Sequence, residues 1–500
     1  MTATLIRHAR LAGADAPRDL LVADGRIRSI GVAKQDLVGL GDFDAVDLEG
    51  RFVGPGLWDA HVHVGQWALT SSRLDVSSAT SAAETVALVR RHLEHAPPTP
   101  GTVLVGNGFR DGLWAAAPTA ELLDSLDAPV ALVSGDVHTV WSNAAALRLV
   151  GLPATDWWLR EQPAFDLNVL LSDVPVAQLD SWVLDAADRA AARGVVGISD
   201  FEFNDAASAW IRRFGAGFRG LRVRALFYPP HLDAAVAAGI RTGVEIGDDP
   251  HALSDGLLTG GPYKLFTDGS LNTRTAWCDD PYPGLTGPEA AGIPTYEPAE
   301  LLAAARAAAE HGLIPTIHAI GDRATSLALD TFEALGLAAD APDRGSIQHA
   351  QLMRTADAPR FAALGVRASV QPEQAMDDRD VSDHYWAGRT DRVYAFRTML
   401  DAGAELEFGS DAPVAPLDPW ITMAAAVTRS RDGREPWHPE QRLPVADALR
   451  ASQGGVAALA EGAVADLVVT DEDPHTVDGD TLRAMPVWGT MLAGEWTYRS

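Results

Sequence analysis

The segment Gly-Pro-Gly-Leu-Trp-Asp-Ala-His-Val-His at residues 54–63 decides how the rest of the chain is interpreted. An apolar, strand-like run here ends in two histidines, His61 and His63. Side chains two residues apart on a strand point to the same face, so the two imidazole rings can bind one metal ion. An isolated His-x-His pair is as often simply packed or solvent-facing. Other residues must therefore decide between these interpretations.

The chain around this segment has the pattern of a parallel barrel. Apolar runs alternate with helical patterns, such as residues 299–311 and 323–335, which is typical of βα units. Eight runs are predicted as strands: 57–64, 195–201, 223–228, 263–268, 314–319, 346–351, 367–371 and 406–411. The expected fold class is therefore α/β, a TIM (β/α)₈ barrel.

Both ends of the chain are predicted to form short strands. The N-terminal runs are 4–10, 19–23 and 26–30, and the C-terminal runs are 465–470 and 487–498. Because neither group could bury a sheet alone, we expect a small composite β-sandwich domain from both termini. The predicted domains are residues 1–55 with 440–500 for this β-domain and residues 56–439 for the barrel.

The stretch after the first barrel strand is too long for a plain crossover. It contains β-like runs at 102–105 and 130–133, and a helix is expected to start near Ser142 or Asn143. We therefore predict a folded insertion at about residues 65–190. Its place in the chain predicts that it lies over the barrel mouth, where such enzymes keep their substrates.

Composition excludes several classes of protein. The 40 Lys and Arg against 68 Asp and Glu give a formal charge of −28, which argues against nucleic acid as a partner. Cys278 is the single cysteine. We expect no secretory leader, because the first residues lack a basic region followed by an apolar one, and no apolar run approaches the roughly 20 residues needed to cross a membrane. We expect a cytoplasmic protein acting on a small-molecule amide, and the sequence is compatible with a homo-oligomer.

Three more candidate metal ligands stand where predicted strands end. His318 and His349 lie near the ends of the fifth and sixth barrel strands, and Asp411 ends the eighth. One such residue is more often structural, but five on four strands of one barrel favour a shared site. Imidazole and carboxylate are ligands that zinc and similar cations accept.

Lys264 is unusual because it places a cation in the middle of an apolar strand. A buried lysine is costly, so it needs a shifted pKa, a paired charge or a covalent modification. Carbamylation by carbon dioxide would turn it into an anion that bridges two metals. The alternatives are a stem that reaches solvent from the strand's end or a pair with Asp268.

The ordered set His61, His63, Lys264, His318, His349 and Asp411 resembles the amidohydrolase superfamily. The sequence around these residues is similar to the YtcJ-like branch of this superfamily, which includes N-substituted formamide deformylase. The matching segments are 56–63, 138–143, 264–271, 318–322, 348–350 and 409–413. The resemblance implies a metal-dependent hydrolase with a binuclear centre, a carbamylated lysine and hydrolysis of a C–N bond other than a peptide bond.

This resemblance also implies roles for the ligands. His61, His63 and Asp411 would hold one cation, and His318 and His349 the other, two Zn²⁺ per chain. Lys264, carbamylated by carbon dioxide, would bridge them. A metal-bound hydroxide is the expected nucleophile for an amide, such as an N-formyl or N-acyl amine, and Asp411 the general base. His138 would hydrogen-bond the substrate or the hydroxide, or else cap the following helix.

Recognition of the substrate is assigned to residues near these motifs, although core packing is the default role of a tryptophan. Glu373 stands where the branch commonly has a histidine. The candidate substrate-binding residues are Trp67, Trp114, Trp141, Trp277 and Glu373. The tryptophans favour an apolar or aromatic amide over a sugar or phosphate ester.

Two other functions stay open. The first is a mononuclear deaminase or cyclic amidase on the same barrel, in which Lys264 is unmodified. The second, from a different class, is a catalytically silent barrel that acts as a binding protein. Metal content and a screen of amides distinguish these functions from the binuclear hydrolase.

Overall fold

The computed structural model describes the chain except for residues 1–2, 38–42, 112–113, 136, 138, 161, 248, 339–340, 342 and 457. The chain forms two compact units. One comprises Met1–Val64 together with Ala187–Ser500, and the other comprises Gly65–Ala186.

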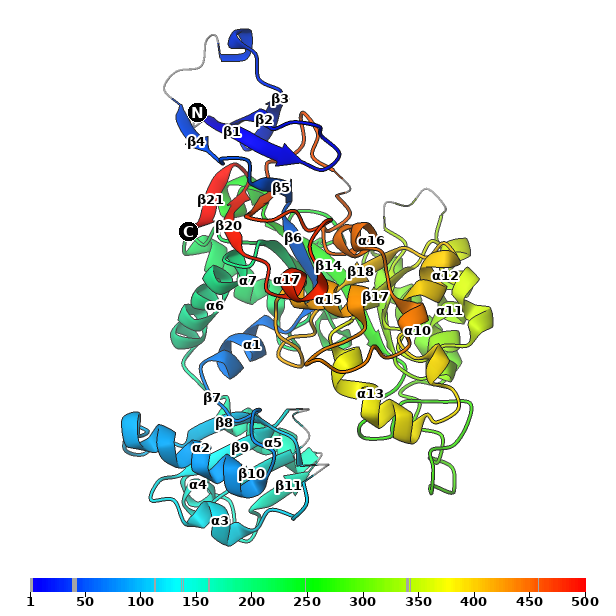
Figure 1. Ribbon diagram of the computed structural model, residues 1–500. Helices are drawn as coiled ribbons and strands as arrows, with labels where there is room; N and C mark the ends of the chain where they lie inside the picture. Colours follow the sequence, from blue (N-terminus) through cyan, green and yellow to red (C-terminus); the bar gives the residue numbers. More distant parts are fainter. Residues whose placement is uncertain are drawn as a thin grey trace. The chain divides into compact units, whose positions relative to one another are not determined.

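The centre of the first unit is a sheet of eight parallel strands in the order β18-β17-β16-β15-β14-β13-β12-β6 (Figure 1). A parallel bridge between Val62 and Ala412 joins its two edges and closes the barrel. The strands are β6 (Leu57–Val62), β12 (Val195–Asp200), β13 (Arg222–Phe227), β14 (Leu258–Phe266), β15 (Pro315–Ala319), β16 (Ser346–His349), β17 (Arg367–Val370) and β18 (Leu406–Phe408). The predicted TIM barrel is confirmed.

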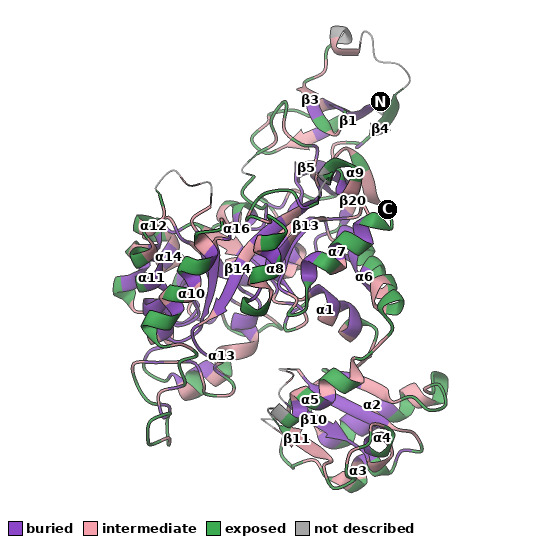
Figure 2. Cartoon of the chain, turned by 180° about the vertical axis from the view of Figure 1, so that it is seen from behind, coloured by how far each residue is buried: buried purple, intermediate pink, exposed green. Residues whose placement is uncertain are grey.

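Helices surround this barrel, and Figure 2 shows buried strands such as β14 enclosed by helices with exposed outer faces. They are α7 (Ala206–Gly215), α8 (Leu232–Ala237), α9 (Pro250–Ser254), α10 (Pro298–Ala309), α11 (Asp322–Leu335), α12 (Ala358–Leu364), α13 (Gln374–Tyr385), α14 (Phe396–Asp401), α15 (Pro419–Thr428), α16 (Val445–Ala451) and α17 (Gly479–Arg483). The two helices predicted at residues 299–311 and 323–335 correspond to α10 and α11. A capping box between Glu297 and Glu300 begins α10, and Gly336, with φ of 58°, ends α11.

The two chain ends build a second sheet, as the composite β-domain requires. Its order is β21-β20-β19-β5-β1-β2-β3, with β4 paired to β1. Its strands are β1 (Ala3–Leu11), β2 (Arg18–Ala23), β3 (Arg26–Ile30), β4 (Asp44–Asp47), β5 (Phe52–Pro55), β19 (Leu467–Thr470), β20 (Val487–Leu492) and β21 (Glu495–Arg499). The junction between the ends is the antiparallel pair β5 and β19.

The core of this sheet takes residues from both ends. Ile6 and Val22 come from the N-terminal strands, and Leu467, Val469 and Met491 from the C-terminal ones. The run predicted at 487–498 is two strands, because Ala493 and Gly494 have positive φ and turn the chain between them. The division of the chain near residue 440 stays a prediction, and α16, beyond that point, contacts the barrel strand β18.

The second unit has its own sheet, in the order β11-β10-β9-β8-β7, of which β8 and β9 were predicted. Its strands are β7 (Leu74–Asp75), β8 (Leu104–Phe109), β9 (Val130–Ser134), β10 (Thr139–Ser142) and β11 (Trp158–Arg160). The helices of this stretch are α1 (Val64–Ser71), α2 (Ala82–His95), α3 (Ala120–Asp124), α4 (Ala144–Leu149), α5 (Gln162–Leu171) and α6 (Val176–Ala191), which runs on into the first unit. Asn143 caps α4 by accepting from the backbone N–H of Ala146. That this unit covers the barrel mouth stays a prediction.

Within the described part of the chain, no helix is both long enough and apolar enough to span a lipid bilayer.

The composite sheet makes a prediction about stability. Leu467 is fully buried in the core shared by the two ends. Leu467→Ala removes three buried carbon atoms and is expected to lower the free energy of unfolding by about 2–5 kcal/mol, measured by urea denaturation. Val464→Ala is the control, because Val464 is 37% exposed and should change stability by no more than about 0.5 kcal/mol. Equal effects of the two variants would contradict a shared core.

Candidate metal centre

The site forms where the first barrel strand meets the last. Asp59 is a buried residue of β6, and its Oδ1 accepts from the backbone N–H groups of His61 and Ser410, both at 3.0 Å. Burial raises the pKa of Asp59 to about 6. Gly409 leaves room for this close approach, because a Cβ there would lie 2.6 Å from the Cβ of His61. Asp59 and Gly409 thus set how β6, which leads into the two histidines, lies against β18 and the segment after it that carries Asp411.

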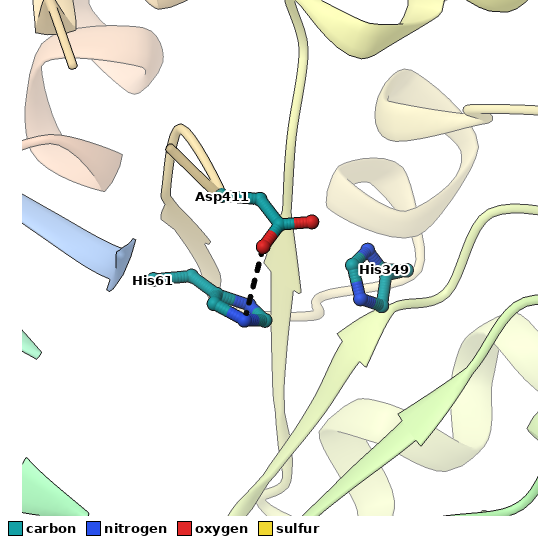
Figure 3. Close-up of side chains that lie close together, drawn as sticks. All are labelled: His61, His349 and Asp411. Atoms are coloured by element: carbon teal, nitrogen blue, oxygen red, sulfur yellow. Dashed lines mark ion pairs between the residues drawn. The ribbon is translucent and has the colours of Figure 1, made fainter. Parts of the chain in front are cut away.

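Asp411 faces both histidines of β6. Its Oδ1 lies 3.4 Å from the Nε2 of His61 and 3.4 Å from the Nε2 of His63. Figure 3 shows the side chains of His61, His349 and Asp411 pointing toward one another from separate strand ends. The ligand atoms of these three residues all lie within 4.8 Å of one another.

These distances fit a divalent cation. Zinc bonds to nitrogen and oxygen of about 2.0–2.1 Å in a tetrahedral site separate neighbouring donor atoms by about 3.4 Å. The spacing from Asp411 to His61 and His63 has this value. The donors are borderline nitrogen and hard oxygen atoms, which suit zinc and similar ions. These residues therefore fit the divalent cation that the resemblance to amidohydrolases implies.

Hydrogen bonds orient the imidazole rings so that one nitrogen of each is available. The Nδ1 of His61 lies 2.8 Å from Oε1 of Gln348, which leaves Nε2 directed at Asp411. The Nε2 of His318 lies 3.1 Å from the carbonyl oxygen of Gly269, which leaves its Nδ1 available. Such outer partners fix the tautomer of a metal-binding histidine. His349 joins the two groups, since its ring centroid lies 5.3 Å from that of His61 and 4.6 Å from that of His318.

The protonation states also suit a cation. Burial lowers the pKa of His61 and of His318 well below the usual value, and burial lowers that of His349 to about 4. Burial acts to raise the pKa of Asp411, but the adjacent histidines outweigh it and hold this pKa below its usual range. At neutral pH the imidazoles are therefore uncharged and the carboxylate is ionised, as metal binding requires.

Lys264 is 1% exposed and lies on β14 between two aromatic rings. Its Nζ is 4.8 Å from the ring centroid of Phe201 and 5.1 Å from that of Phe266. Burial lowers the pKa of Lys264 to about 7. Among the described residues no carboxylate forms an ion pair with it. Its stem does not reach solvent, and Asp268 instead accepts backbone N–H bonds from Trp277, Ile320 and Gly321.

Two of the candidate ligands occupy strained backbone. His349 has φ of 70° and Asp411 has φ of 56°, in the left-handed region that residues other than glycine seldom adopt. Such strain persists where the surrounding structure holds it, and it clusters at functional sites. Here it turns both side chains inward as β16 and β18 end.

The structure brings together all six predicted metal ligands within the first unit. Their roles as ligands stay a prediction, and so does the role of Asp411 as general base. His138 lies outside the described residues.

The predicted substrate-binding residues have other contacts in the structure. Trp141 is fully buried in the core of the second unit, and Trp114 packs against it with ring centroids 6.4 Å apart. Trp67 lies half-buried on α1 of the same unit. In the first unit, Arg323 lies 5.7 Å from the ring of Trp277, and Glu373 Oε1 accepts from Arg431 and Arg483, both at 3.0 Å. Their roles in substrate binding stay predictions.

The structure adds residues that the sequence did not assign. Phe201 stacks on His61 with ring centroids 3.7 Å apart, and Gln374 donates from Nε2 to Oδ2 of Asp411 at 3.1 Å. Two of the additions had a signal in the sequence. Asp59 shares the strand face of His61 and His63, and Gln348 precedes His349. Phe201 and Gln374 had none.

Comparison with known proteins agrees with this site. The model of a family described as the amidohydrolase family matches residues 44–498. The chain is 26% identical to the putative amidohydrolase YtcJ of Bacillus subtilis (strain 168), over 98% of this chain and 98% of the relative. It is also 26% identical to N-substituted formamide deformylase of Arthrobacter pascens, over 96% of this chain and 94% of the relative.

A solved structure matches as well. The crystal structure of an uncharacterized metal-dependent hydrolase from Pyrococcus horikoshii OT3 matches with a TM-score of 0.79 and 26% identity, over 96% of this chain and 99% of the other. The resemblance to the YtcJ-like branch is therefore confirmed. With a family model that matches nearly its whole length, the chain belongs to the amidohydrolase family, a family of hydrolases.

Proposed function

We propose that the protein hydrolyses the C–N bond of an amide, such as an N-formyl or N-acyl amine, with two divalent cations, Zn²⁺ being the first candidate. The observation that carries this proposal is the 3.4 Å spacing of the Asp411 carboxylate from two imidazole nitrogens where β6 and β18 end. The name of the Arthrobacter pascens relative, N-substituted formamide deformylase, supports an N-formyl amine as the first substrate to test.

The candidate ligands would have different roles in this reaction. His61, His63 and Asp411 would hold one cation, and His318 and His349 the other. The cations, when bound, supply a nucleophile from water at neutral pH and polarise the scissile carbonyl. Asp411 takes a proton from the attacking water and passes it to the nitrogen of the departing amine, so that amide and water become acid and amine.

Lys264 would bridge the two cations as a carbamate. An ammonium about 4 Å from a dication is repelled by several kcal/mol even at an effective dielectric constant of 20. Burial favours the neutral amine. This amine attacks carbon dioxide, loses one proton and becomes an N-linked carboxylate, which replaces the repulsion with coordination. The aromatic walls of Phe201 and Phe266 keep bulk water from the amine.

The remaining assignments follow from position in the sequence. His138 would hydrogen-bond the substrate, and Trp67, Trp114, Trp141, Trp277 and Glu373 are proposed to line its binding site. A substrate with an apolar or aromatic group suits this set.

One observation favours a second candidate function. Only His61, His349 and Asp411, among the described residues, form a group whose ligand atoms lie within 4.8 Å of one another. Such a compact set could serve one cation, as in a mononuclear deaminase or cyclic amidase with an unmodified Lys264.

Metal content distinguishes the two candidates. The protein purified with Zn²⁺ and bicarbonate is expected to hold two zinc ions per chain by elemental analysis. Removing them with a chelator should abolish hydrolysis of N-formyl amines, and adding Zn²⁺ back should restore it. One ion per chain at full activity would favour the mononuclear enzyme instead.

Lys264→Ala tests the carbamate. The variant lacks the bridging anion, so it should hold one zinc ion fewer and lose about a hundredfold or more in kcat. Short carboxylic acids should restore part of both losses by filling the vacated space. The chain has one other lysine, Lys34, so Lys34→Ala is the matched control and should retain both ions. Full metal content and activity in Lys264→Ala would exclude a bridging role.

Lys264 should also shape the pH dependence of stability in the metal-free protein without carbon dioxide. Its pKa is about 7 when folded and near 10.5 when unfolded, so the unfolded state binds one more proton between these values. Stability therefore rises with pH across this window, by about 1.4 kcal/mol per pH unit from this group. Urea denaturation at pH 7.5 and 9.5 should show this gain for the unaltered protein relative to Lys264→Met. Parallel pH profiles would show that the buried amine is not desolvated.

A further inference from the structure

The two oxygens of the Asp411 carboxylate have different neighbours. Oδ1 faces the Nε2 atoms of His61 and His63, each at 3.4 Å. Oδ2 accepts a hydrogen bond from Nε2 of Gln374 at 3.1 Å. One oxygen therefore lies toward the cation site and the other lies on a neutral amide.

We propose that Gln374 is a positioning residue for Asp411, holding its carboxylate so that Oδ1 stays directed at the cation held with His61 and His63. This inference rests on the proposed function and assigns a residue that acts on a ligand rather than on the substrate.

Asp411 needs such a partner. The terminal torsion of an aspartate is broad and roughly twofold, so a carboxylate with no restraint exchanges its two oxygens freely. The backbone of Asp411 is already turned into the left-handed region, with φ of 56°. A hydrogen bond to an ionised acceptor is about twice as strong as a neutral one, so one donor can select the orientation. An amide donor also adds no positive charge beside the cation.

Gln374 is itself held in place. It is 7% exposed and is the first residue of α13, and its backbone N–H donates to the carbonyl of Gln371 at 3.2 Å. The preceding residue, Glu373, is 3% exposed and pairs with Arg431 and Arg483. Two arginines distant in sequence therefore hold the start of α13, from which the amide reaches Asp411.

The test removes the donor and keeps the volume. Gln374→Met should weaken Zn²⁺ binding by about tenfold to a hundredfold in competition with a chelator, the usual cost of losing an outer partner of a ligand. The kcat for the N-formyl amine should fall by a similar factor while KM stays within about twofold, because the residue does not touch substrate. Gln374→Leu also lacks the amide donor and should lower the zinc affinity and kcat by similar factors. It replaces Gln374→Met in the test if that variant does not fold.

Gln441→Met is the matched control. Gln441 is 6% exposed and donates from Nε2 to Thr398 at 2.9 Å, away from the ligands, so its variant should keep both the zinc affinity and kcat. Unchanged zinc affinity and kcat in a folded Gln374→Met would overturn the inference, and so would a rise in KM alone.

Failure of the proposed function is distinguishable. If the unaltered protein binds Zn²⁺ but hydrolyses no amide, the proposed reaction is wrong while the zinc competition still decides the role of Gln374. If the unaltered protein binds no Zn²⁺, both proposals are wrong.

Discussion

Backbone hydrogen bonds across the seam between β6 and β18 are the constraint on which the rest of the structure depends. The N–H of Asp411 donates to the carbonyl of His61 at 2.7 Å, and the N–H of His63 donates to that of Ala412 at 2.9 Å. These bonds close eight strands into a barrel and bring Asp411 opposite two imidazole rings. Because closure and the ligand set share the same residues, a barrel that closes correctly also assembles the cation site.

Burial then determines the chemistry of the assembled side chains. Desolvation disfavours the protonated imidazoles of His61, His318 and His349 and the ammonium of Lys264, whereas the neighbouring histidines keep Asp411 ionised. Neutral imidazoles around one carboxylate, with little access to water, are stabilised when a cation binds, because the cation neutralises the carboxylate and accepts the nitrogen lone pairs. The same desolvation that makes Lys264 costly as an ammonium favours the neutral amine that the proposed carbamylation requires. The strained backbone at His349 and Asp411 is consistent with a site shaped for binding rather than for stability.

Much of this could be predicted from the sequence, because the signals are local. All eight barrel strands were located, and the six candidate ligands stand within short motifs, five of them near predicted strand ends and Lys264 inside a strand. The contact from Gln374 to Asp411 could not be predicted, since it joins the start of a polar helix to a strand end 37 residues away. Periodicity carries no information about such contacts, and the sequence of α13 has no apolar stripe that would predict a helix. Nor could it reveal that Trp141 packs inside the second unit's core.

The most direct test is anomalous X-ray diffraction at the zinc edge, on crystals of the full chain grown with Zn²⁺ and bicarbonate. The account predicts two anomalous peaks, one beside His61, His63 and Asp411 and the other beside His318 and His349, with density for a carboxylate on the Nζ of Lys264 between them. A bare lysine with zinc bound, or zinc away from the seam of β6 and β18, would contradict it.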